Sequence, residues 1–266
     1  MPELPEVETV VRSLRPCTVG KTIDTVLVAR EQSIRTPLTD SATFAHELRG
    51  RHIQSLERRA KAIIFLLNAD LALVFHFKLG AVVLCENDKV VETDGVALNF
   101  SDETCLNFTR LALSEFHLVR ADRLDRIEVL KGGGNPLSRS FTLRRFKEIL
   151  PPGKQLKSAL TDQNLIGGIG NAWSDEILWN ARLNPLRKVS ELSEPEFYGL
   201  HKQIKATLRK GIKLGGETGF IDGRGRKGRY KRIVHGREGK PCPRDGHKIE
   251  LYKKGRKTYW CPECQK

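Results

Sequence analysis

The chain opens with Met1-Pro-Glu-Leu-Pro-Glu-Val-Glu8, and this stretch leads directly into an amphipathic helix. Pro5 suits the first helical position, and the glutamates of the first turn complement the positive end of the helix dipole. One apolar stripe at the spacing i, i+3, i+4 and i+7 follows, formed by Val7, Val10, Val11 and Leu14. We therefore expect Pro2 and Glu3 to be held on the short lead-in to a packed helix.

Pro2 offers an unusual chemical group once Met1 is removed. It is then a free secondary amine beside Glu3, and an α-amino group with a pKa of about 7.7–8 is partly neutral near pH 7. A neutral amine can attack an electrophilic carbon, and a secondary amine gives an iminium that cannot lose its charge by deprotonation at nitrogen. The alternative is that Pro2 only permits removal of methionine and that the glutamates cap the helix.

The charge of the chain is concentrated near its end. Among its 266 residues, with a net charge of +14, residues 201–266 hold 20 Lys/Arg against 6 Asp/Glu, and the rest balances. Such a basic segment, interleaved with apolar and aromatic residues, predicts a folded module that faces a polyanion rather than a disordered tail. No apolar run approaches the roughly 20 residues of a membrane span, and the N-terminus is acidic, so we expect a soluble, cytoplasmic protein.

The last three of the six cysteines cluster as Cys242 and Cys261-x-x-Cys264. Three thiolates in a reducing compartment indicate one structural Zn²⁺, which needs a fourth ligand. Asp245 and His247 both follow Cys242, and His247 is favoured because nitrogen is the more usual zinc partner beside thiolates. A site that binds no metal is the third possibility. The hairpin between the ligand pairs would present its basic tip, residues 253–257, to a nucleic acid.

The order of predicted elements separates a β-rich first part from a helical second part. The stretch Lys131-Gly-Gly-Gly134 and the pair Gly215-Gly216 mark the boundaries, which gives segments 1–130, 131–216 and 217–266. The predicted strands are Thr22–Val28, His52–Glu57, Ala62–Leu67, Ala72–Phe77, Ala81–Cys85, Val96–Ser101, Thr104–Thr109 and Phe116–Arg120. The predicted helices after the first are Ala42–Leu48, Phe141–Leu150, Leu156–Leu160, Asn171–Asn180 and Glu194–Leu214.

Two further features have both a structural and a functional interpretation. Gly167-Gly-Ile-Gly170 opens a helix at Asn171, which suits phosphate binding at a helix N-terminus or a plain turn between helices. Lys61 stands before the apolar run Ala62–Leu67, where it is either a surface lysine or a group that holds a phosphate.

Motifs spread over nearly the whole chain match one family. They are Met1–Glu8, Arg58-Arg-Ala-Lys61, Asn135-Pro-Leu137, Lys157 with Gly168-Ile-Gly-Asn171 and Glu176-Ile-Leu178, Val234-His-Gly-Arg237, and Gly255-Arg-Lys-Thr258 with Cys261-Pro-Glu-Cys-Gln265. Together they resemble the bacterial formamidopyrimidine-DNA glycosylases, a helix–two-turn–helix family related to endonuclease VIII. The resemblance implies an α+β fold, with an N-terminal β-sandwich and flanking helices, a helix–two-turn–helix domain and a zinc-binding β-hairpin.

The resemblance also implies an activity and a set of site residues. The expected enzyme is a monomeric bifunctional glycosylase/AP lyase of base excision repair, acting on oxidised or ring-opened purines in damaged double-stranded DNA. In it, Pro2 would attack C1′ and Glu3 would act as the acid/base. Lys61 would hold a phosphate or assist proton transfer in β-elimination, and Arg256 would assist at the phosphate in δ-elimination. Glu6 and Glu176 would support the active site. The expected DNA contacts are made by Lys157, Asn171, Arg237 and Leu79.

The sequence departs from the family where lesion and opposite base are read. His76-Phe-Lys-Leu-Gly-Ala81 offers Leu79 in place of a methionine wedge, and Ala112-Leu-Ser-Glu115 lacks the usual arginine and phenylalanine. We therefore expect the lyase chemistry with an unusual substrate preference. The rival functions are a non-catalytic DNA-binding protein of the same fold and a zinc-hairpin protein that acts on RNA, neither of which needs a proline amine.

Overall fold

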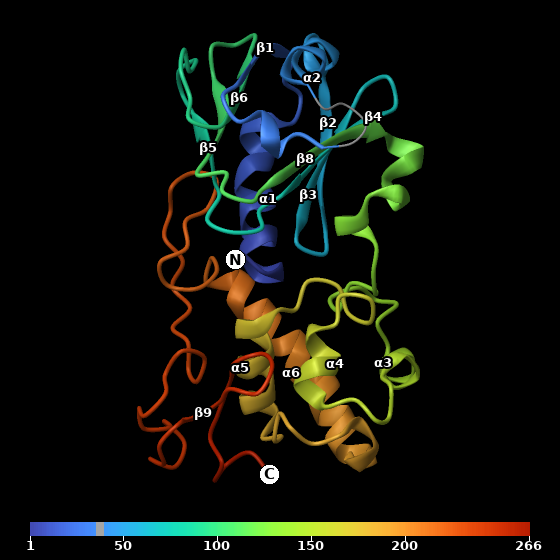
Figure 1. Cartoon of the computed structure of the whole chain (residues 1–266), viewed down its shortest axis with the longest axis vertical. Helices are drawn as coiled ribbons and strands as arrows, with labels where there is room; N and C mark the ends of the chain where they lie inside the picture. The colour runs from blue at the N-terminus through green and yellow to red at the C-terminus, as the bar shows by residue number, and fades with distance from the viewer. Residues whose placement is uncertain (36–39) are drawn as a thin grey trace. The chain divides into compact units, whose positions relative to one another are not determined.

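The computed structural model describes residues 1–35 and 40–266, which form two compact units (Figure 1). Unit 1 comprises Met1–Lys131 and Gly219–Gly228, and unit 2 comprises Gly132–Thr218 and Arg229–Lys266. Within the described part of the chain, no helix is both long and apolar enough to cross a bilayer.

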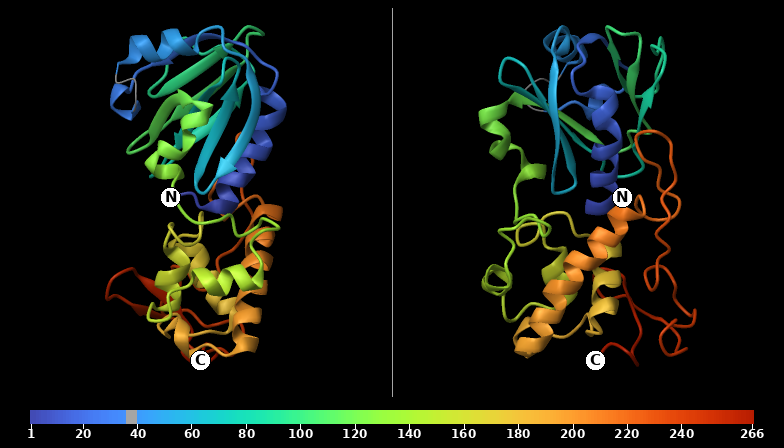
Figure 2. Two further views of the ribbon diagram at one scale, coloured as in Figure 1. Left: turned by 90° about the vertical axis from the view of Figure 1, so that its right-hand side faces the viewer. Right: turned by 180° about the vertical axis from the view of Figure 1, so that it is seen from behind.

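Unit 1 is built on two antiparallel four-stranded sheets. The first has the order β2 (Ile53–Arg59), β3 (Ala62–Leu67), β4 (Leu71–His76) and β8 (Glu115–Arg120). The second has the order β1 (Ile23–Val28), β6 (Val96–Phe100), β7 (Cys105–Thr109) and β5 (Val82–Glu86). Helix α1 (Leu4–Thr18) packs on β2 and β5, and α2 (Ser41–Leu48) packs on β1 (Figure 2).

A cluster of phenylalanine rings fills the space between the two sheets. Phe75 of β4 lies 4.8 Å from the ring centroids of both Phe108 (β7) and Phe116 (β8), and Phe65 (β3) also contacts Phe108. Because side chains alternate along a strand, the other face of β3 and β4 carries Ile64 and Val74. This outer face is buried beneath the 3₁₀ turns η2 (Ala121–Arg126) and η3 (Glu128–Leu130). Unit 1 is therefore the predicted β-sandwich.

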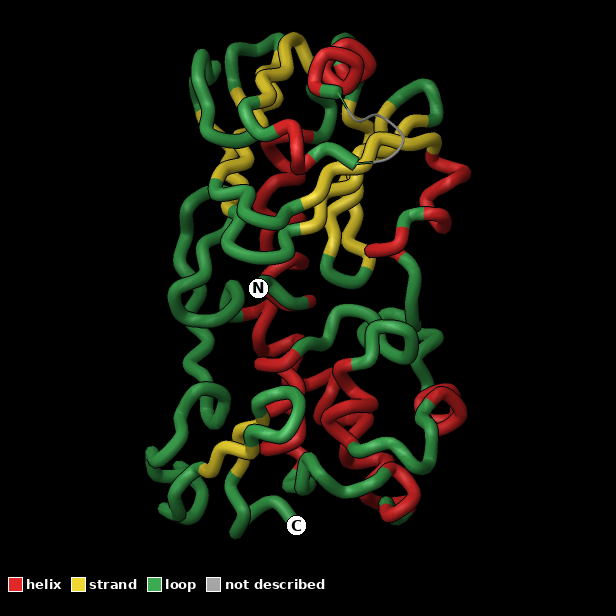
Figure 3. Tube along the Cα trace, viewed as in Figure 1, coloured by secondary structure: helices red, strands yellow, loops and turns green. Residues whose placement is uncertain are grey.

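Unit 2 contains four α-helices and a short hairpin. The helices are α3 (Leu143–Ile149), α4 (Leu156–Thr161), α5 (Asn171–Ala181) and α6 (Glu194–Lys213), and the hairpin strands are β9 (Glu250–Tyr252) and β10 (Thr258–Trp260). Helices α5 and α6 cross closely at Gly211, where a Cβ would lie 2.2 Å from the Trp173 ring. Apart from the hairpin and short bridges, the backbone after α6 is irregular (Figure 3).

The predicted elements are confirmed with small shifts at their ends. Each of the eight strands expected before residue 121 is present, and β3 has the predicted bounds. The start of the first helix differs from the prediction, because Glu3 is the N-cap residue and Pro5 occupies the second helical position. The Glu6 carboxylate accepts a hydrogen bond from the Glu3 backbone N–H at 3.1 Å, which completes a capping box.

Candidate active site and metal centre

The lead-in to α1 is held against unit 1. The Glu3 and Glu6 side chains are buried, Pro2 is half-buried, and Met1 is exposed. The capping box between Glu3 and Glu6 fixes the backbone directly after Pro2. The expectation that Pro2 and Glu3 are held rather than frayed agrees with this geometry.

Lys61 lies on a tight turn between β2 and β3. Lys61 is only 7% exposed, so it does not fit the interpretation as a surface lysine. The Arg58 guanidinium donates to the Ala60 carbonyl at 3.0 Å and pairs with the Glu8 carboxylate of α1 at 3.0 Å. Burial raises the pKa of Glu8, but hydrogen bonds from Arg12 and Arg58 and their charges outweigh it and leave the pKa lowered. An ionised Glu8 thus ties the Lys61 turn to α1.

The segments expected to read the lesion form two neighbouring loops of unit 1. Leu79, after β4, is 51% exposed, and Leu113, before β8, is 59% exposed. The Ser114 hydroxyl donates to the Phe77 carbonyl at 2.8 Å and joins the two loops. At their base, burial and the charge of Lys78 lower the pKa of His76 to about 4, against the opposing effect of Glu115.

Lys157 and Asp175 form a buried ion pair in unit 2. The Lys157 ammonium lies 2.6 Å from Asp175 Oδ1 and 2.7 Å from the Lys257 carbonyl oxygen. The lysine side chain is 4% exposed and the aspartate side chain is fully buried. This geometry does not favour the expected direct contact of Lys157 with a DNA phosphate, because the ammonium is already engaged inside the unit. Asp175 was missed by the sequence analysis, and only its position before Glu176 could have drawn attention to it.

Glu176 is a buried carboxylate that organises the segment after α6. It accepts hydrogen bonds from the Tyr230 hydroxyl at 2.9 Å and from the backbone N–H groups of Ile233, Val234 and His235 at 2.9–3.0 Å. Burial, together with the Glu176 charge, raises the pKa of Tyr230. Glu176 therefore acts on the backbone of residues 230–235, and that backbone continues into the exposed Arg237.

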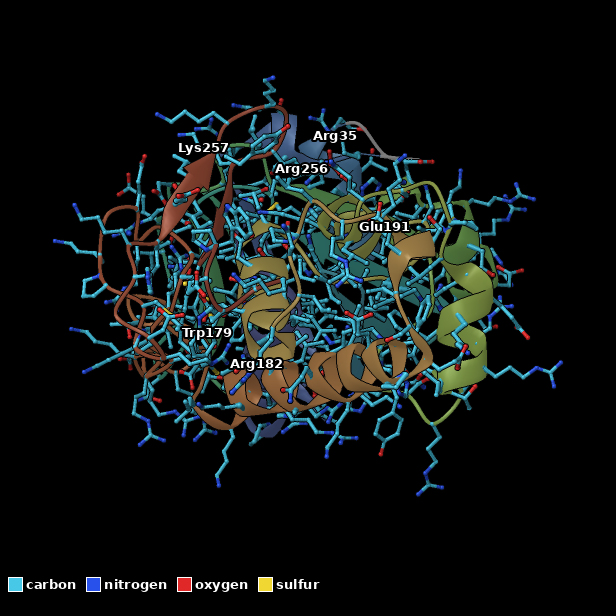
Figure 4. The ribbon with its side chains drawn as sticks, turned by 90° about the horizontal axis from the view of Figure 1, so that it is seen from below. Arg35, Trp179, Arg182, Glu191, Arg256 and Lys257 are labelled. Carbon is cyan, nitrogen blue, oxygen red and sulfur yellow. The ribbon has the colours of Figure 1, made fainter. Side chains whose placement is uncertain are left out.

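Two expected phosphate contacts occupy different parts of unit 2. Asn171 begins α5 directly after the N-cap Gly170, and its buried Oδ1 has no hydrogen-bond partner among the described residues. Arg256 is exposed at the hairpin tip next to Lys257 (Figure 4). It borders a recess of about 390 Å³ whose other lining residues are Lys154, Ser158, Thr161, Asp162 and Gln163.

Four side chains form a group with the composition of a metal site. The ligand atoms of Cys242, Asp245, Cys261 and Cys264 all lie within 4.8 Å of one another. The Trp179 indole N–H donates to Cys242 Sγ at 3.4 Å, and the Arg244 guanidinium donates to Cys264 Sγ at 3.5 Å. Such N–H···S contacts stabilise thiolates, which are the form that binds metal.

The geometry favours Asp245 over His247 as the fourth ligand. The His247 backbone N–H donates to Asp245 Oδ1 at 3.0 Å, and its carbonyl accepts from the Cys242 N–H at 2.7 Å. These bonds close a turn that directs the Asp245 carboxylate to Cys261 Sγ at 3.3 Å. The His247 side chain is 59% exposed and is not part of the group, so Asp245 is the residue that the turn brings to the thiols.

Comparison with known proteins identifies the family. Residues 1–111 match the model of the formamidopyrimidine-DNA glycosylase N-terminal domain, and residues 133–221 match that of the formamidopyrimidine-DNA glycosylase H2TH domain. The chain belongs to the formamidopyrimidine-DNA glycosylase family. Formamidopyrimidine-DNA glycosylases (Fpg) are bifunctional enzymes of base excision repair, so the predicted family, fold and enzyme class are confirmed.

Relatives match along the whole chain. It is 37% identical to the formamidopyrimidine-DNA glycosylase of Lactobacillus delbrueckii subsp. bulgaricus, with 100% of both chains covered, and 38% identical to that of Pelotomaculum thermopropionicum, with 100% and 99% covered. Among solved structures, a complex of Lactococcus lactis Fpg with abasic-site DNA has a TM-score of 0.88 at 29% identity, with 99% of each chain covered. MutM (Fpg) of Thermus thermophilus has a TM-score of 0.85 at 32% identity, with 99% and 98% covered.

Proposed function

We propose that this chain excises oxidised or ring-opened purines from double-stranded DNA and then cleaves the strand by β,δ-elimination. The Pro2 amine attacks C1′ of the flipped nucleoside, the base leaves, and an iminium joins the enzyme to the sugar. Glu3 acts as the acid/base that opens the sugar ring, and Lys61 assists proton transfer in the first elimination. Arg256 assists at the phosphate in the second elimination. The observation that carries this proposal is the capping box that holds Pro2 and Glu3 at the start of α1.

The DNA contacts follow from charge and from the start of α5. Asn171 and the N-terminal N–H groups of α5 suit a phosphate, because amide N–H groups donate to phosphate oxygens. Arg237 supplies an exposed cation, and Leu79 supplies an apolar wedge. We expect a monomer that works along chromosomal DNA, with affinity that falls steeply as salt increases.

The substrate preference is proposed to differ from the family's usual one. The loops at Leu79 and Ala112–Glu115 present apolar or acidic side chains instead of a guanidinium and an aromatic ring. Without a guanidinium, the opposite base loses a hydrogen-bond donor that distinguishes cytosine. We therefore expect 8-oxoguanine opposite cytosine to be handled less selectively than ring-opened purines or abasic sites, which a panel of lesions against four opposite bases measures.

The metal centre is proposed to hold one structural Zn²⁺ through Cys242, Asp245, Cys261 and Cys264. Three thiolates and one carboxylate fit the usual tetrahedral zinc chemistry, and the N–H···S contacts support the thiolate form. Metal analysis of the pure protein tests it, with one zinc per chain expected. Asp245→Ala should lower the zinc content and His247→Ala should keep it. The reverse result would restore His247 as the ligand.

Borohydride trapping on abasic-site duplex tests the enzymatic proposal. The natural chain should form a covalent adduct, Pro2→Gly should form none, and Pro5→Ala, which changes the second proline of the same octapeptide, should still form it. Intact mass must show that Met1 is absent, because a retained methionine leaves the Pro2 nitrogen in a peptide bond. No adduct from chains that lack Met1 would favour the non-catalytic DNA-binding protein, and preference for RNA in competition would favour the third function.

A further inference from the structure

We propose that Lys157, Asp175 and His235 form a buried positioning network that holds the hairpin tip and thereby sets the place of Arg256. The proposal rests on the function proposed above, in which Arg256 assists the second elimination. It assigns Lys157 a role through its neighbours, in place of a direct contact with DNA.

Asp175 is the centre of the network because its two carboxylate oxygens contact donors from three separate segments. One oxygen, Oδ1, pairs with the Lys157 ammonium. The other, Oδ2, lies 2.8 Å from His235 Nδ1 and 3.3 Å from the Tyr259 backbone N–H. One buried carboxylate therefore joins α4, α5, the segment at residue 235 and strand β10.

The contact of Lys157 with the hairpin is made to backbone rather than to a side chain. Its ammonium donates to the Lys257 carbonyl, and residue 257 directly follows Arg256. A buried ammonium is tolerated only where its N–H groups find acceptors, so this carbonyl is held firmly in place. The contact thus fixes the backbone one residue away from the Arg256 side chain.

The hairpin has few other means of fixing its tip; one is the Thr258 hydroxyl, which donates to the Arg256 carbonyl at 2.9 Å. Strands β9 and β10 are three residues long each, and the turn between them contains Gly255 at φ 78°. Residues 253–257 are all exposed, whereas Thr258 is buried again. The order of the tip therefore depends on anchors at its base, and Lys157 with Asp175 supplies two of them.

His235 links this network to the other buried carboxylate of α5. Its ring packs edge-on against Tyr259 of β10, with centroids 5.0 Å apart, and its backbone N–H donates to Glu176 at 3.0 Å. The consecutive residues Asp175 and Glu176 thus hold two different segments. Glu176 holds the incoming segment, and Asp175 holds the hairpin against it.

The network makes a prediction that differs between the two elimination steps. Pro2, Glu3 and Lys61 belong to unit 1, whereas every member of the network belongs to unit 2. Lys157→Met should therefore keep the borohydride adduct and the first elimination. It should slow the second elimination by about tenfold or more, because a small misplacement of a catalytic group is costly. The β-elimination product then accumulates relative to the gapped δ-elimination product.

The experiment measures the ratio of the two products in single-turnover reactions of the full chain. Lys157→Arg keeps the cation and should restore much of the ratio. Lys240→Met, which removes an exposed lysine of the same unit, should leave the ratio unchanged. The double variant Lys157→Met/Asp175→Asn removes both charges of the pair, and it is used if the single change prevents folding. The same change in the product ratio is expected.

A second readout does not depend on catalysis. Trypsin cuts after the exposed basic residues of 253–257, so a released tip should be cut faster in Lys157→Met than in the natural chain. An unchanged product ratio, or a changed ratio with unchanged cleavage at the tip, would overturn the positioning role. If the natural chain forms no borohydride adduct, the proposed function fails, and tip cleavage alone still decides whether the network holds the hairpin.

Discussion

The Lys61 turn and the Leu79 loop of unit 1 are built in opposite ways. Lys61 is 7% exposed on a turn whose carbonyl is bound by the buried Arg58, and Glu8 of α1 holds that arginine. Leu79 is 51% exposed, beyond the point where Ser114 secures the loop backbone at Phe77. One site is fixed by buried charge, and the other is an anchored loop with a free apolar tip.

This difference explains where the chain can depart from its family. Changing a residue of the Lys61 turn disturbs a buried ion pair and the helix that carries Pro2 and Glu3. Changing Leu79 alters only the proposed DNA contact, since an exposed side chain contributes little to the folded state. The residues proposed for the chemistry are thus constrained by the fold, and the residue proposed to enter the DNA is not.

The largest expected effect comes from breaking the brace of the Lys61 turn. Arg58→Met leaves the Glu8 carboxylate and the Ala60 carbonyl without the guanidinium, so we expect a loss of about 3 kcal/mol in the free energy of unfolding. The rate of borohydride trapping should fall by up to about 100-fold, because Lys61 and α1 lose their common support. Urea unfolding and trapping kinetics measure the two effects.

Arg59→Met is the matched control on the same strand. Arg59 pairs with Asp125 on the surface, where the two side chains are 41% and 93% exposed, and surface pairs contribute little. It should behave like the natural chain. Equal losses of stability and trapping rate in the two variants would mean that the buried Arg58 supports the Lys61 turn no more than the surface Arg59 does.

A smaller effect is expected from acid at the base of the Leu79 loop. The pKa of His76 is lowered to about 4 by burial, by Lys78, and by the charges of Lys61 and His117, while Glu115 raises it. The unfolded chain takes up a proton near pH 6.5 and the folded chain does not, so stability decreases as the pH falls below about 6.5. Between pH 7.5 and 5 the loss is about 2 kcal/mol, and above that range His76 contributes almost no pH dependence.

Thermal unfolding from pH 7 to pH 5 measures this contribution. His76→Gln should reduce the pH dependence, and a smaller slope from His117 and His201, whose pKa values burial also lowers, should remain. His46→Gln, at a side chain that is 85% exposed, should leave the pH dependence as in the natural chain. An undiminished slope in His76→Gln would assign the titration to another group and would separate His76 from the stability of the loop base.

The sequence predicted the elements better than the contacts between them. Strand β3 has the predicted bounds because an unbroken apolar run, Ala62–Leu67, leaves little freedom in where it begins and ends. The long-range contacts that hold the Lys61 turn and the hairpin could not be predicted in this way. Arg58 reaches Glu8 across 50 positions, and Lys157 reaches the Lys257 carbonyl across 100, and neither distance leaves a periodic signal.

The metal ligands show the same limit at short range. The spacing of Cys242 and Cys261-x-x-Cys264 was sufficient to predict a cluster, and the three thiols do gather. The choice between Asp245 and His247 depended on the turn that follows Cys242. Hydrogen bonds of the His247 backbone shape that turn. The general preference of zinc for nitrogen beside thiolates carries no information about these hydrogen bonds.

The smallest expected effect is at the exposed tip of the Leu79 loop. Leu79→Ala should leave the free energy of unfolding unchanged and should weaken binding to abasic-site duplex by roughly 1 kcal/mol, about fivefold, because less apolar surface enters the base stack. Val91→Ala is the control, since Val91 is 91% exposed on another loop of unit 1 and should not affect binding. If Leu79→Ala instead lowers stability, its side chain belongs to the fold after all, and the contrast with the Lys61 turn is lost.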